Sequence, residues 1–227
     1  MGHILLAGGA EFGGRMSEPD LRAIELAGGL DAPICIIPTA AAPDHNHKRA
    51  GNNGVRWFRS LGTRNVFTAD VIDSLSANDS SLAASIRASR LIYLLGGFPR
   101  HLGETLANSA CWRAALDAYE QGAVIAGSSA GAMVLCGYYY DPNEKKLLRG
   151  LNLIPNACVL PHHNNFGKSW AKQLIQLLPD ITLIGIDEQT GMINDINGQW
   201  QIYGAGVVTL YRGGQAQGYE RGEPFSF

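Results

Sequence analysis

The sequence predicts an α/β protein of three layers, in which a mostly parallel central sheet lies between two layers of helices. Short apolar runs rich in β-branched residues alternate with amphipathic segments of helical length along most of the chain. This alternation is typical of βα units, whose strands run parallel and whose helices cover both faces of the sheet. The chain of 227 residues, 46% of them hydrophobic, is long enough to bury one large core. We find no internal repeat or linker in it, so we expect a single domain over residues 1–227.

The first half of the chain begins with an apolar strand at 3–7, which ends in two glycines. An amphipathic helix at 18–27 follows, and Gly28-Gly29 stops it. The other elements that we expect in this half are strands at 33–38, 65–69 and 90–95 and helices at 55–61, 82–87 and 111–121.

The second half begins with a short apolar strand at 123–126, followed by a turn of small residues and a helix at 130–135. Residues 141–149 are polar, and we expect them to be irregular. Turn residues interrupt the strand-like tail at 191–212, so hairpins are expected there. The remaining expected elements are strands at 157–160 and 181–186 and a helix at 170–178.

The turn at 127–131 reads Gly-Ser-Ser-Ala-Gly and matches the pattern G-x-S-x-G. A strand before it and a helix after it are the context of a nucleophile elbow, which holds a serine at strained backbone angles. Only small neighbours fit such a turn, and here all of them are small. The pattern indicates that Ser129 is a nucleophile. The alternatives are a turn with no catalytic role and a phosphate-binding loop.

A serine nucleophile needs a base within hydrogen-bond reach, and histidine is the usual one. His162 and His163 follow the strand at 157–160, so they lie at the strand end where ligands of such sheets bind. We expect His162 to be the base, with His163 as the alternative. The other histidines fit less well: His3 lies inside a strand, His101 on an expected loop, and His45 and His47 in an H-x-H pair that we interpret as a polar loop rather than a metal site.

The base in turn needs an acid that orients it. Asp187 and Glu188 end the strand at 181–186, which places them at a strand end near that of the histidines. Asp141 and Glu144 remain alternatives, although their segment is the most loop-like.

Four segments resemble the serine peptidase family that includes dipeptidase E and cyanophycinase, whose fold is similar to the class I glutamine amidotransferase domain. The resemblance covers nearly the whole chain. The matching segments are Leu94-Leu95-Gly96-Gly97, the elbow at 127–132, Pro161-His162-His163 and Gly185-Ile186-Asp187-Glu188.

The resemblance implies a Ser-His-Glu triad of Ser129, His162 and Glu188. We further expect the backbone N–H groups of Gly97 and Ala130 to form an oxyanion hole. The chain would then hydrolyse a small peptide or amide through an acyl-enzyme, with no cofactor and no metal. The order Ser, His, Glu differs from that of α/β-hydrolases, where the acid precedes the histidine. An esterase with the same triad and a non-catalytic amidotransferase-like binding module are the alternatives.

The segment after His162 departs from the family. Both named branches carry arginines there, whereas residues 164–178 hold only Lys168 and Lys172 as basic residues. Lysine does not replace the bidentate recognition of a carboxylate by arginine. We therefore expect neither an acidic side-chain preference nor cyanophycin degradation, unless Arg100 restores the former. The weaker candidates for substrate contact are Phe98, Arg100, His163 and Lys168.

The composition excludes several other classes of protein. A net charge of −2 and a pI near 6.3 give no electrostatic footprint for nucleic acid. No apolar run approaches the ~20 residues that span a bilayer, and we expect no signal peptide at the N-terminus. The four cysteines are scattered without a C-x-x-C pair, which is typical of free thiols in the reducing cytoplasm. We expect a cytoplasmic enzyme with a small peptide substrate, and a homodimer is possible.

Overall fold

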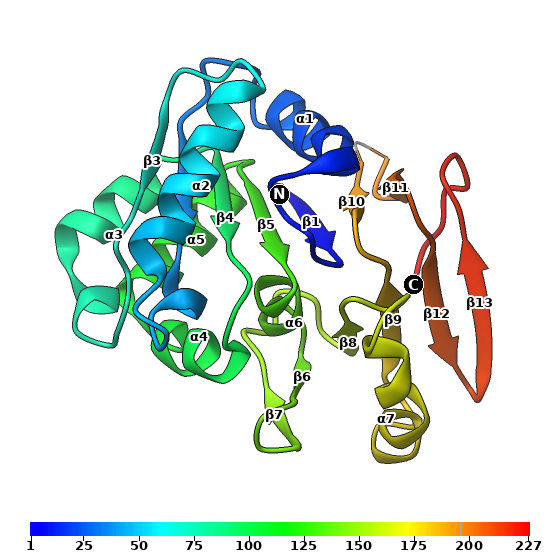
Figure 1. The fold of residues 1–227 in the computed structure, drawn as a ribbon. Coiled ribbons are helices and arrows are strands. Elements are labelled where there is room, and N and C mark those ends of the chain that lie inside the picture. The colour runs from blue at the N-terminus through cyan, green and yellow to red at the C-terminus, as the bar shows by residue number, and fades with distance from the viewer. Residues whose placement is uncertain (196) are drawn as a thin grey trace.

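A computed structural model describes residues 1–195 and 197–227, and a seven-stranded sheet lies at its centre (Figure 1). The strand order is β11-β10-β1-β5-β4-β2-β3. Five strands run parallel: β1 (His3–Ala7), β2 (Ile34–Ile37), β3 (Val66–Thr68), β4 (Leu91–Leu94) and β5 (Val124–Ser128). A hairpin of β10 (Thr190–Asn194) and β11 (Trp200–Gly204) adds to one edge in antiparallel orientation. The prediction of a mostly parallel central sheet is confirmed.

Each central strand sends alternate side chains into two apolar clusters, one on each face. In β4, Leu91 and Tyr93 belong to one cluster, and Ile92 and Leu94 belong to the other. This alternation follows from the two-residue period of a strand, and it explains why strands buried on both faces are apolar throughout. The first face is covered by α1 (Ser17–Leu26) and α2 (His47–Ser60), and the second by α3 (Ser80–Arg87), α4 (Pro99–Leu106), α5 (Ala110–Glu120) and α6 (Ala130–Leu135).

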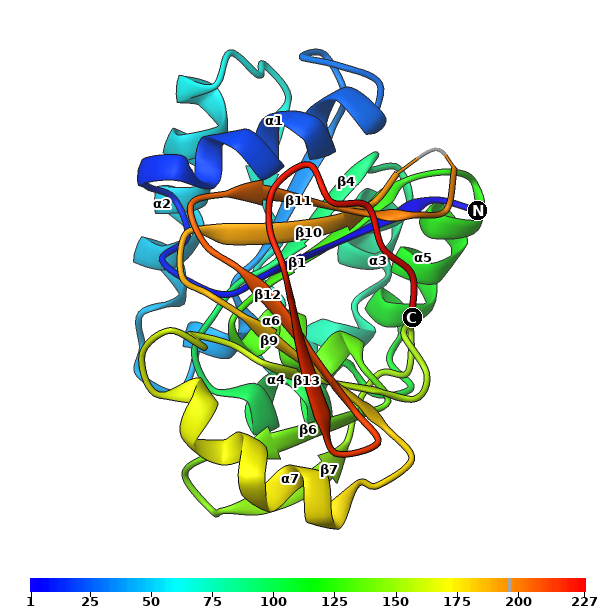
Figure 2. The ribbon, with the colours of Figure 1, turned by 90° about the vertical axis from the view of Figure 1, so that its right-hand side faces the viewer.

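A second sheet carries the strands from which the candidate histidines and acids follow. Its order is β13-β12-β9-β8, and β8 and β9 are parallel neighbours. One face of this sheet joins the larger core through Val159 and Ile184. On the other face, Cys158 and Leu183 pack against the helix α7, which lies far from α1 and α2 (Figure 2). The elements are β8 (Ala157–Leu160), α7 (Ala171–Leu177), β9 (Thr182–Ile186), β12 (Val208–Arg212) and β13 (Gln215–Tyr219). The sequence predicts β8 and β9 as strands, but the local pattern does not separate them from the central sheet.

The structure corrects three local predictions. His101, expected on a loop, lies in α4 (residues 99–106), in which Pro99 pre-sets the first helical turn. Residues 141–149, expected to be irregular, belong to a hairpin of β6 (Tyr138–Asp141) and β7 (Lys146–Arg149). Helix α2 begins at residue 47 rather than 55. The sequence misses its first two turns because the residues that they bury are glycines, which an apolar periodicity does not reveal.

The four cysteine thiols are free and buried, as the sequence predicts: Cys35, Cys111, Cys136 and Cys158. Among the described residues, no helix combines the length and apolar character needed to cross a membrane.

One carboxyl group is buried between the two helices of the first face. Asp20 of α1 is 0% exposed, and its Oδ2 accepts a hydrogen bond of 2.8 Å from Trp57 Nε1 of α2. Burial raises the pKa of Asp20 to about 7, and the bond from Trp57 opposes part of the rise. Asp20 is therefore largely protonated in the folded protein under mildly acidic conditions.

We expect Asp20→Asn to remove a pH dependence of stability. Between about pH 4 and about pH 7 the unfolded chain ionises this carboxyl while the folded chain keeps the proton, so stability falls as the pH rises. The difference is on the order of a few kcal/mol, because one pKa unit corresponds to about 1.4 kcal/mol. Urea unfolding across this range measures it, with the exposed Asp31→Asn as the control. Parallel curves for wild type and Asp20→Asn would contradict the expectation.

Candidate active site

Ser129 lies in a sharp turn between β5 and α6. Its backbone has φ 50° and ψ −111°, a conformation that residues with a Cβ rarely adopt. The helix begins so close to the sheet that a Cβ on Gly131 would lie 2.2 Å from the carbonyl oxygen of Leu94. This crowding explains the small residues of the elbow, and it leaves the Ser129 hydroxyl projecting from the carboxyl end of the sheet.

Three successive carbonyls at the end of β1 hold the segments of the site together. The oxygen of Ala7 accepts from the Ser129 N–H at 3.0 Å, and the oxygen of Gly8 accepts from the His162 N–H at 2.7 Å. The oxygen of Gly9 accepts from the N–H of Gln189, the residue after Glu188, at 3.1 Å. The first strand therefore links the central sheet to the ends of β8 and β9.

His162 connects Ser129 with Glu188 through both of its ring nitrogens. Its Nε2 lies 3.0 Å from Ser129 Oγ, and its Nδ1 lies 2.7 Å from Glu188 Oε1. Because a carboxylate only accepts, the neutral ring carries its proton on Nδ1, and Nε2 is free to accept from the serine. The Glu188 N–H in turn donates to Asn164 Oδ1 at 3.0 Å, which anchors the acid.

His163 points away from Ser129 into the second sheet. It is buried, its Nε2 lies 2.8 Å from the Tyr211 hydroxyl, and its Nδ1 lies 3.4 Å from Asp187 Oδ1. Burial lowers the pKa of His163, and the nearby Asp187 opposes this effect. The structure thus pairs His162 with Glu188 beside Ser129, and His163 with Asp187 at the second sheet.

Two backbone N–H groups beside Ser129 have no acceptor among the described residues. Ala130 is the first residue of α6, and first-turn N–H groups of a helix lack an intrahelical acceptor. The Gly97 N–H likewise donates to no group among residues 1–195 and 197–227. Its neighbour Gly96 lies against the nucleophile, since a Cβ built there would be 3.3 Å from Ser129 Cβ. Both groups that the sequence predicts for an oxyanion hole are thus free to donate.

Sequence reasoning missed two side chains of the site. The Phe166 ring stacks on His162 with centroids 4.8 Å apart, and the carboxylate oxygens of Glu11 each lie 3.3 Å from the Gly96 N. Burial raises the pKa of Glu11, while the neighbouring Ser128 hydroxyl, the Gly96 N–H and His162 oppose the rise. Glu11 could have been found, because it follows the first strand at the same sheet edge as Ser129.

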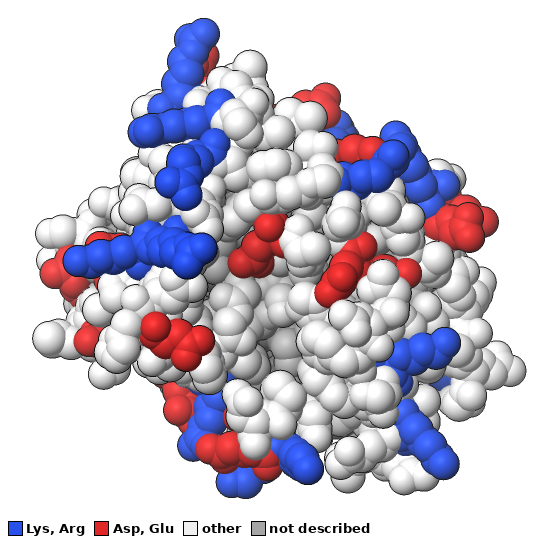
Figure 3. All heavy atoms as spheres, in the orientation of Figure 1, with Lys and Arg blue, Asp and Glu red and all other residues white. Residues whose placement is uncertain are grey.

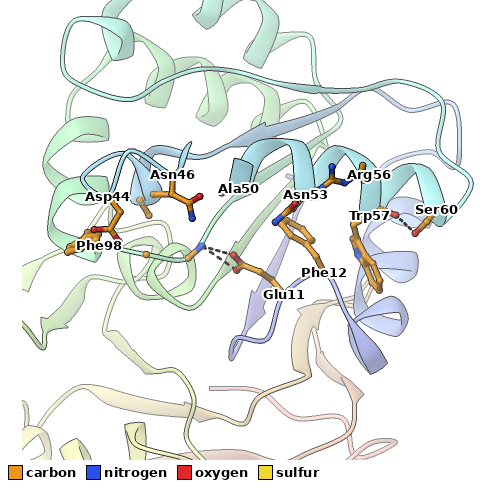
Figure 4. Close-up of a pocket in the computed structure, with 14 residues that line it drawn as sticks. Glu11, Phe12, Asp44, Asn46, Ala50, Asn53, Arg56, Trp57, Ser60 and Phe98 are labelled. Carbon is orange, nitrogen blue, oxygen red and sulfur yellow. Dashed lines mark hydrogen bonds between the residues drawn. The ribbon is translucent and has the colours of Figure 1, made fainter. Parts of the chain in front are cut away.

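A cavity of about 580 Å³ opens beside Glu11, between α2 and the ends of β1 and β4 (Figure 4). Phe98 lines it, but the other weak candidates do not. Arg100 pairs with Glu104 and Glu144 instead, and Lys168 and His163 line a separate, smaller cavity. The space-filling view shows a central hollow with acidic side chains at its rim, whereas basic side chains lie farther out (Figure 3).

The remaining histidines do not take part in the site beside Ser129. His3 Nδ1 and His101 Nε2 each lie 2.7 Å from a backbone carbonyl oxygen, that of Asn194 and Ile72 respectively. No group of three or more His, Cys, Asp or Glu side chains in the described part of the chain could hold a metal ion, and the H-x-H pair at 45 and 47 is no exception.

A strained serine at a strand–helix turn, bonded to a histidine that is bonded to a glutamate, is the arrangement of a serine hydrolase. Residues 4–200 match the model of Peptidase family S51. The chain therefore belongs to this family, and it is a serine-type peptidase. The family resemblance that the sequence motifs indicate is confirmed.

Relatives and solved structures agree with this assignment. The chain is 29% identical to cyanophycinase of Synechococcus elongatus over an alignment 220 positions long, which covers 92% of this chain and 67% of the relative. The alignment with cyanophycinase of Geminocystis herdmanii, also 29% identical, is 230 positions long with its gaps and covers 95% of this chain and 82% of the relative. The crystal structure of a peptidase from an acI-B1 Actinobacterium matches with a TM-score of 0.90 at 30% identity, covering 100% of this chain and 97% of the other. A putative peptidase E protein of Listeria monocytogenes, 21% identical with a TM-score of 0.64 over 93% of this chain and 98% of the other, shares the fold.

We expect Gly9→Ala to disrupt the site rather than the fold. A Cβ on Gly9 would lie 2.2 Å from Cε1 of the His162 ring, so the ring must move away from Ser129. Loss of a positioned base lowers the rate by roughly 100-fold or more. The matched control is Gly28→Ala, because Gly28 also has a positive φ (109° against 124°) but open space around it. Peptide hydrolysis and thermal unfolding measure the two effects, and equal activity of both variants would contradict the expectation.

Proposed function

We propose that this serine-type peptidase hydrolyses small peptides or related amides through a Ser-His-Glu triad of Ser129, His162 and Glu188. The observation that carries the proposal is the continuous row of two hydrogen bonds, 3.0 Å and 2.7 Å long, that joins the three side chains. Each of them has its own backbone anchor to β1 or Asn164, so the row is held before substrate arrives. Such pre-positioning is what makes a weak nucleophile effective.

The proposed reaction is acyl transfer in two steps. Ser129 Oγ attacks the peptide carbonyl while His162 Nε2 takes its proton, and Glu188 stabilises the resulting imidazolium. The free N–H groups of Gly97 and Ala130 stabilise the negative charge on the carbonyl oxygen. His162 then gives the proton to the leaving amine, and a water molecule releases the acyl group by the same route. None of these steps requires a cofactor.

We further propose that the substrate is neither cyanophycin nor a peptide selected for an acidic side chain. Cyanophycinase is the name of the relatives described above, but the cavity at Gly96 and Gly97 is lined by Glu11 and Asp44. An acidic side chain would be repelled there, and Arg100 is held by two glutamates in another cavity. A cytoplasmic location, a homodimer and the lack of a nucleic-acid partner stay predictions from the sequence.

Labelling with a serine-directed fluorophosphonate tests the nucleophile. We expect the label to map to Ser129, and we expect Ser129→Ala to lose the label and to lower kcat by about 10⁴-fold or more with unchanged folding. The matched control is Ser128→Ala, which removes the neighbouring hydroxyl of the same turn but should keep the label. A label on Ser128, or hydrolysis that survives in Ser129→Ala, would refute the assignment.

The adjacent histidines provide a second test. We expect His162→Ala to lower kcat by roughly 10²- to 10⁴-fold, because the general base is lost. His163→Ala should instead lower the free energy of unfolding by about 1–3 kcal/mol, because it leaves Tyr211 and Asp187 without their buried partner. Steady-state kinetics and urea unfolding of both variants distinguish the two roles. If His163→Ala is the more damaging to kcat, the proposed base is wrong.

A further inference from the structure

The carboxyl group of Glu11 lies beside the nucleophile, and the proposed mechanism gives it no task. A Cβ built on Gly96 would lie 3.2 Å from Glu11 Oε2 and 3.3 Å from Ser129 Cβ, so the two side chains flank the same backbone position. The Gly96 N–H donates to Glu11, and the Ser128 hydroxyl is a second donor beside it. A carboxylate with two oxygens has the capacity to accept more.

Glu11 lacks a lysine or arginine partner in the described part of the chain, as the buried Asp20 does, whereas Glu18 has two such partners. Glu18 pairs with Arg15 and Arg221, but no lysine or arginine among the described residues forms an ion pair with Glu11. The one basic residue that lines the adjacent cavity, Arg56, is exposed and donates to Asn53. An ionised carboxylate withdrawn from water without a partner is unfavourable, so a cation that enters the cavity would be bound.

The rest of the cavity also suits a positive charge. Asp44 adds a second carboxylate to the wall, and the rings of Phe12, Trp57 and Phe98 line it as well, with Glu11 facing the space between them (Figure 4). Aromatic faces attract cations, particularly where water is partly excluded. The volume of about 580 Å³ is large enough for one amino-acid side chain.

We propose that Glu11 is a specificity-determining residue that binds a positively charged nitrogen on the substrate residue whose carbonyl Ser129 attacks. The inference rests on the proposed function, since it takes Ser129 as the nucleophile. The cation can come from two sources: the free α-ammonium, which is two bonds from the attacked carbon, or the ammonium or guanidinium of a basic side chain that extends into the cavity.

The competing explanation is that Glu11 only anchors the Gly96-Gly97 loop. Glu11→Gln separates the two explanations, because glutamine keeps an acceptor for the Gly96 N–H but removes the charge. Glu120→Gln is the matched control. Glu120 is an exposed residue at the end of α5, without an ion pair in the described chain, so this variant makes the same change in net charge elsewhere.

The test compares kcat/KM for two matched substrate pairs. The first pair is Ala-Leu amide with a free or an acetylated amino group, and the second is N-acetyl-lysyl-leucine amide with its uncharged norleucine analogue. We expect Glu11→Gln to lower kcat/KM by roughly 10- to 100-fold for the charged member of one pair and to leave the uncharged member nearly unchanged. The first pair identifies the α-ammonium as the cation, and the second identifies the side chain. An equal loss for charged and uncharged members would overturn the inference and support loop anchoring, and so would the absence of any change.

Calorimetric binding of the same four compounds to Ser129→Ala, with and without Glu11→Gln, gives a readout that is independent of turnover. Here too the charged member should bind roughly 10- to 100-fold more weakly after Glu11→Gln. No measurable preference for a charged member would overturn the inference while leaving the nucleophile intact. Hydrolysis that persists in Ser129→Ala would instead refute the proposed function.

Discussion

The site depends on the hydrogen bonds that the end of β1 makes to three distant segments. Ala7, Gly8 and Gly9 offer three consecutive carbonyls, and these accept from the N–H groups of Ser129, His162 and Gln189. Backbone hydrogen bonds fix the main chain of each segment, so the side chains need only adopt their own rotamers to meet. Ser129 and His162 are 33 positions apart in the sequence, and His162 and Glu188 are 26 positions apart, yet their side chains come within 3.0 Å and 2.7 Å. These contacts therefore rely on main-chain geometry, with little contribution from long, flexible side chains.

Burial assigns the two histidines and the two acids to different tasks. The ends of β8 and β9 each carry a pair of polar residues, and the backbone turns at the histidines, where His162 has a φ of 48°. His163 contacts Tyr211 and Asp187 at the second sheet, whereas His162 and Glu188 face Ser129. The pair of His163 and Asp187 stabilises the strand ends from which the partly buried pair of His162 and Glu188 projects, so both pairs are needed for the geometry of the site.

The electrostatics of the cavity separate this chain from a pocket built for acidic substrates. Arginine would be the natural partner for a carboxylate, but Arg100 is neutralised by Glu104 and Glu144. Glu11 and Asp44 line the cavity that reaches Gly96 and Gly97. Substrate preference in a common fold can differ in this way, because pocket residues change without disturbing the triad, the elbow or the sheet.

The sequence by itself determined most of the local structure and the identity of the candidate residues. Strands buried on both faces are apolar throughout, and the elbow tolerates only small residues, so both patterns are visible along the chain. The strand bounds 3–7 and 157–160 and the helix 130–135 agree with the structure residue for residue. The predicted candidates Ser129, His162 and Glu188 are also the side chains that the structure brings together.

Tertiary structure alone decided how these pieces meet. The division into two sheets, the glycine-lined start of α2 and the α4 helix depend on contacts between distant segments, which no local pattern records. The sequence favours His162 over His163 as the base, but only the fold separates the two side chains, one toward Ser129 and the other toward Tyr211. Glu11 is the clearest case: its place after the first strand is visible in the sequence, but only folding sets it against Gly96 without an ion pair to a lysine or arginine of the described chain. The role of a charged side chain depends on the charges around it, and in a folded protein these come from segments that are distant in the sequence.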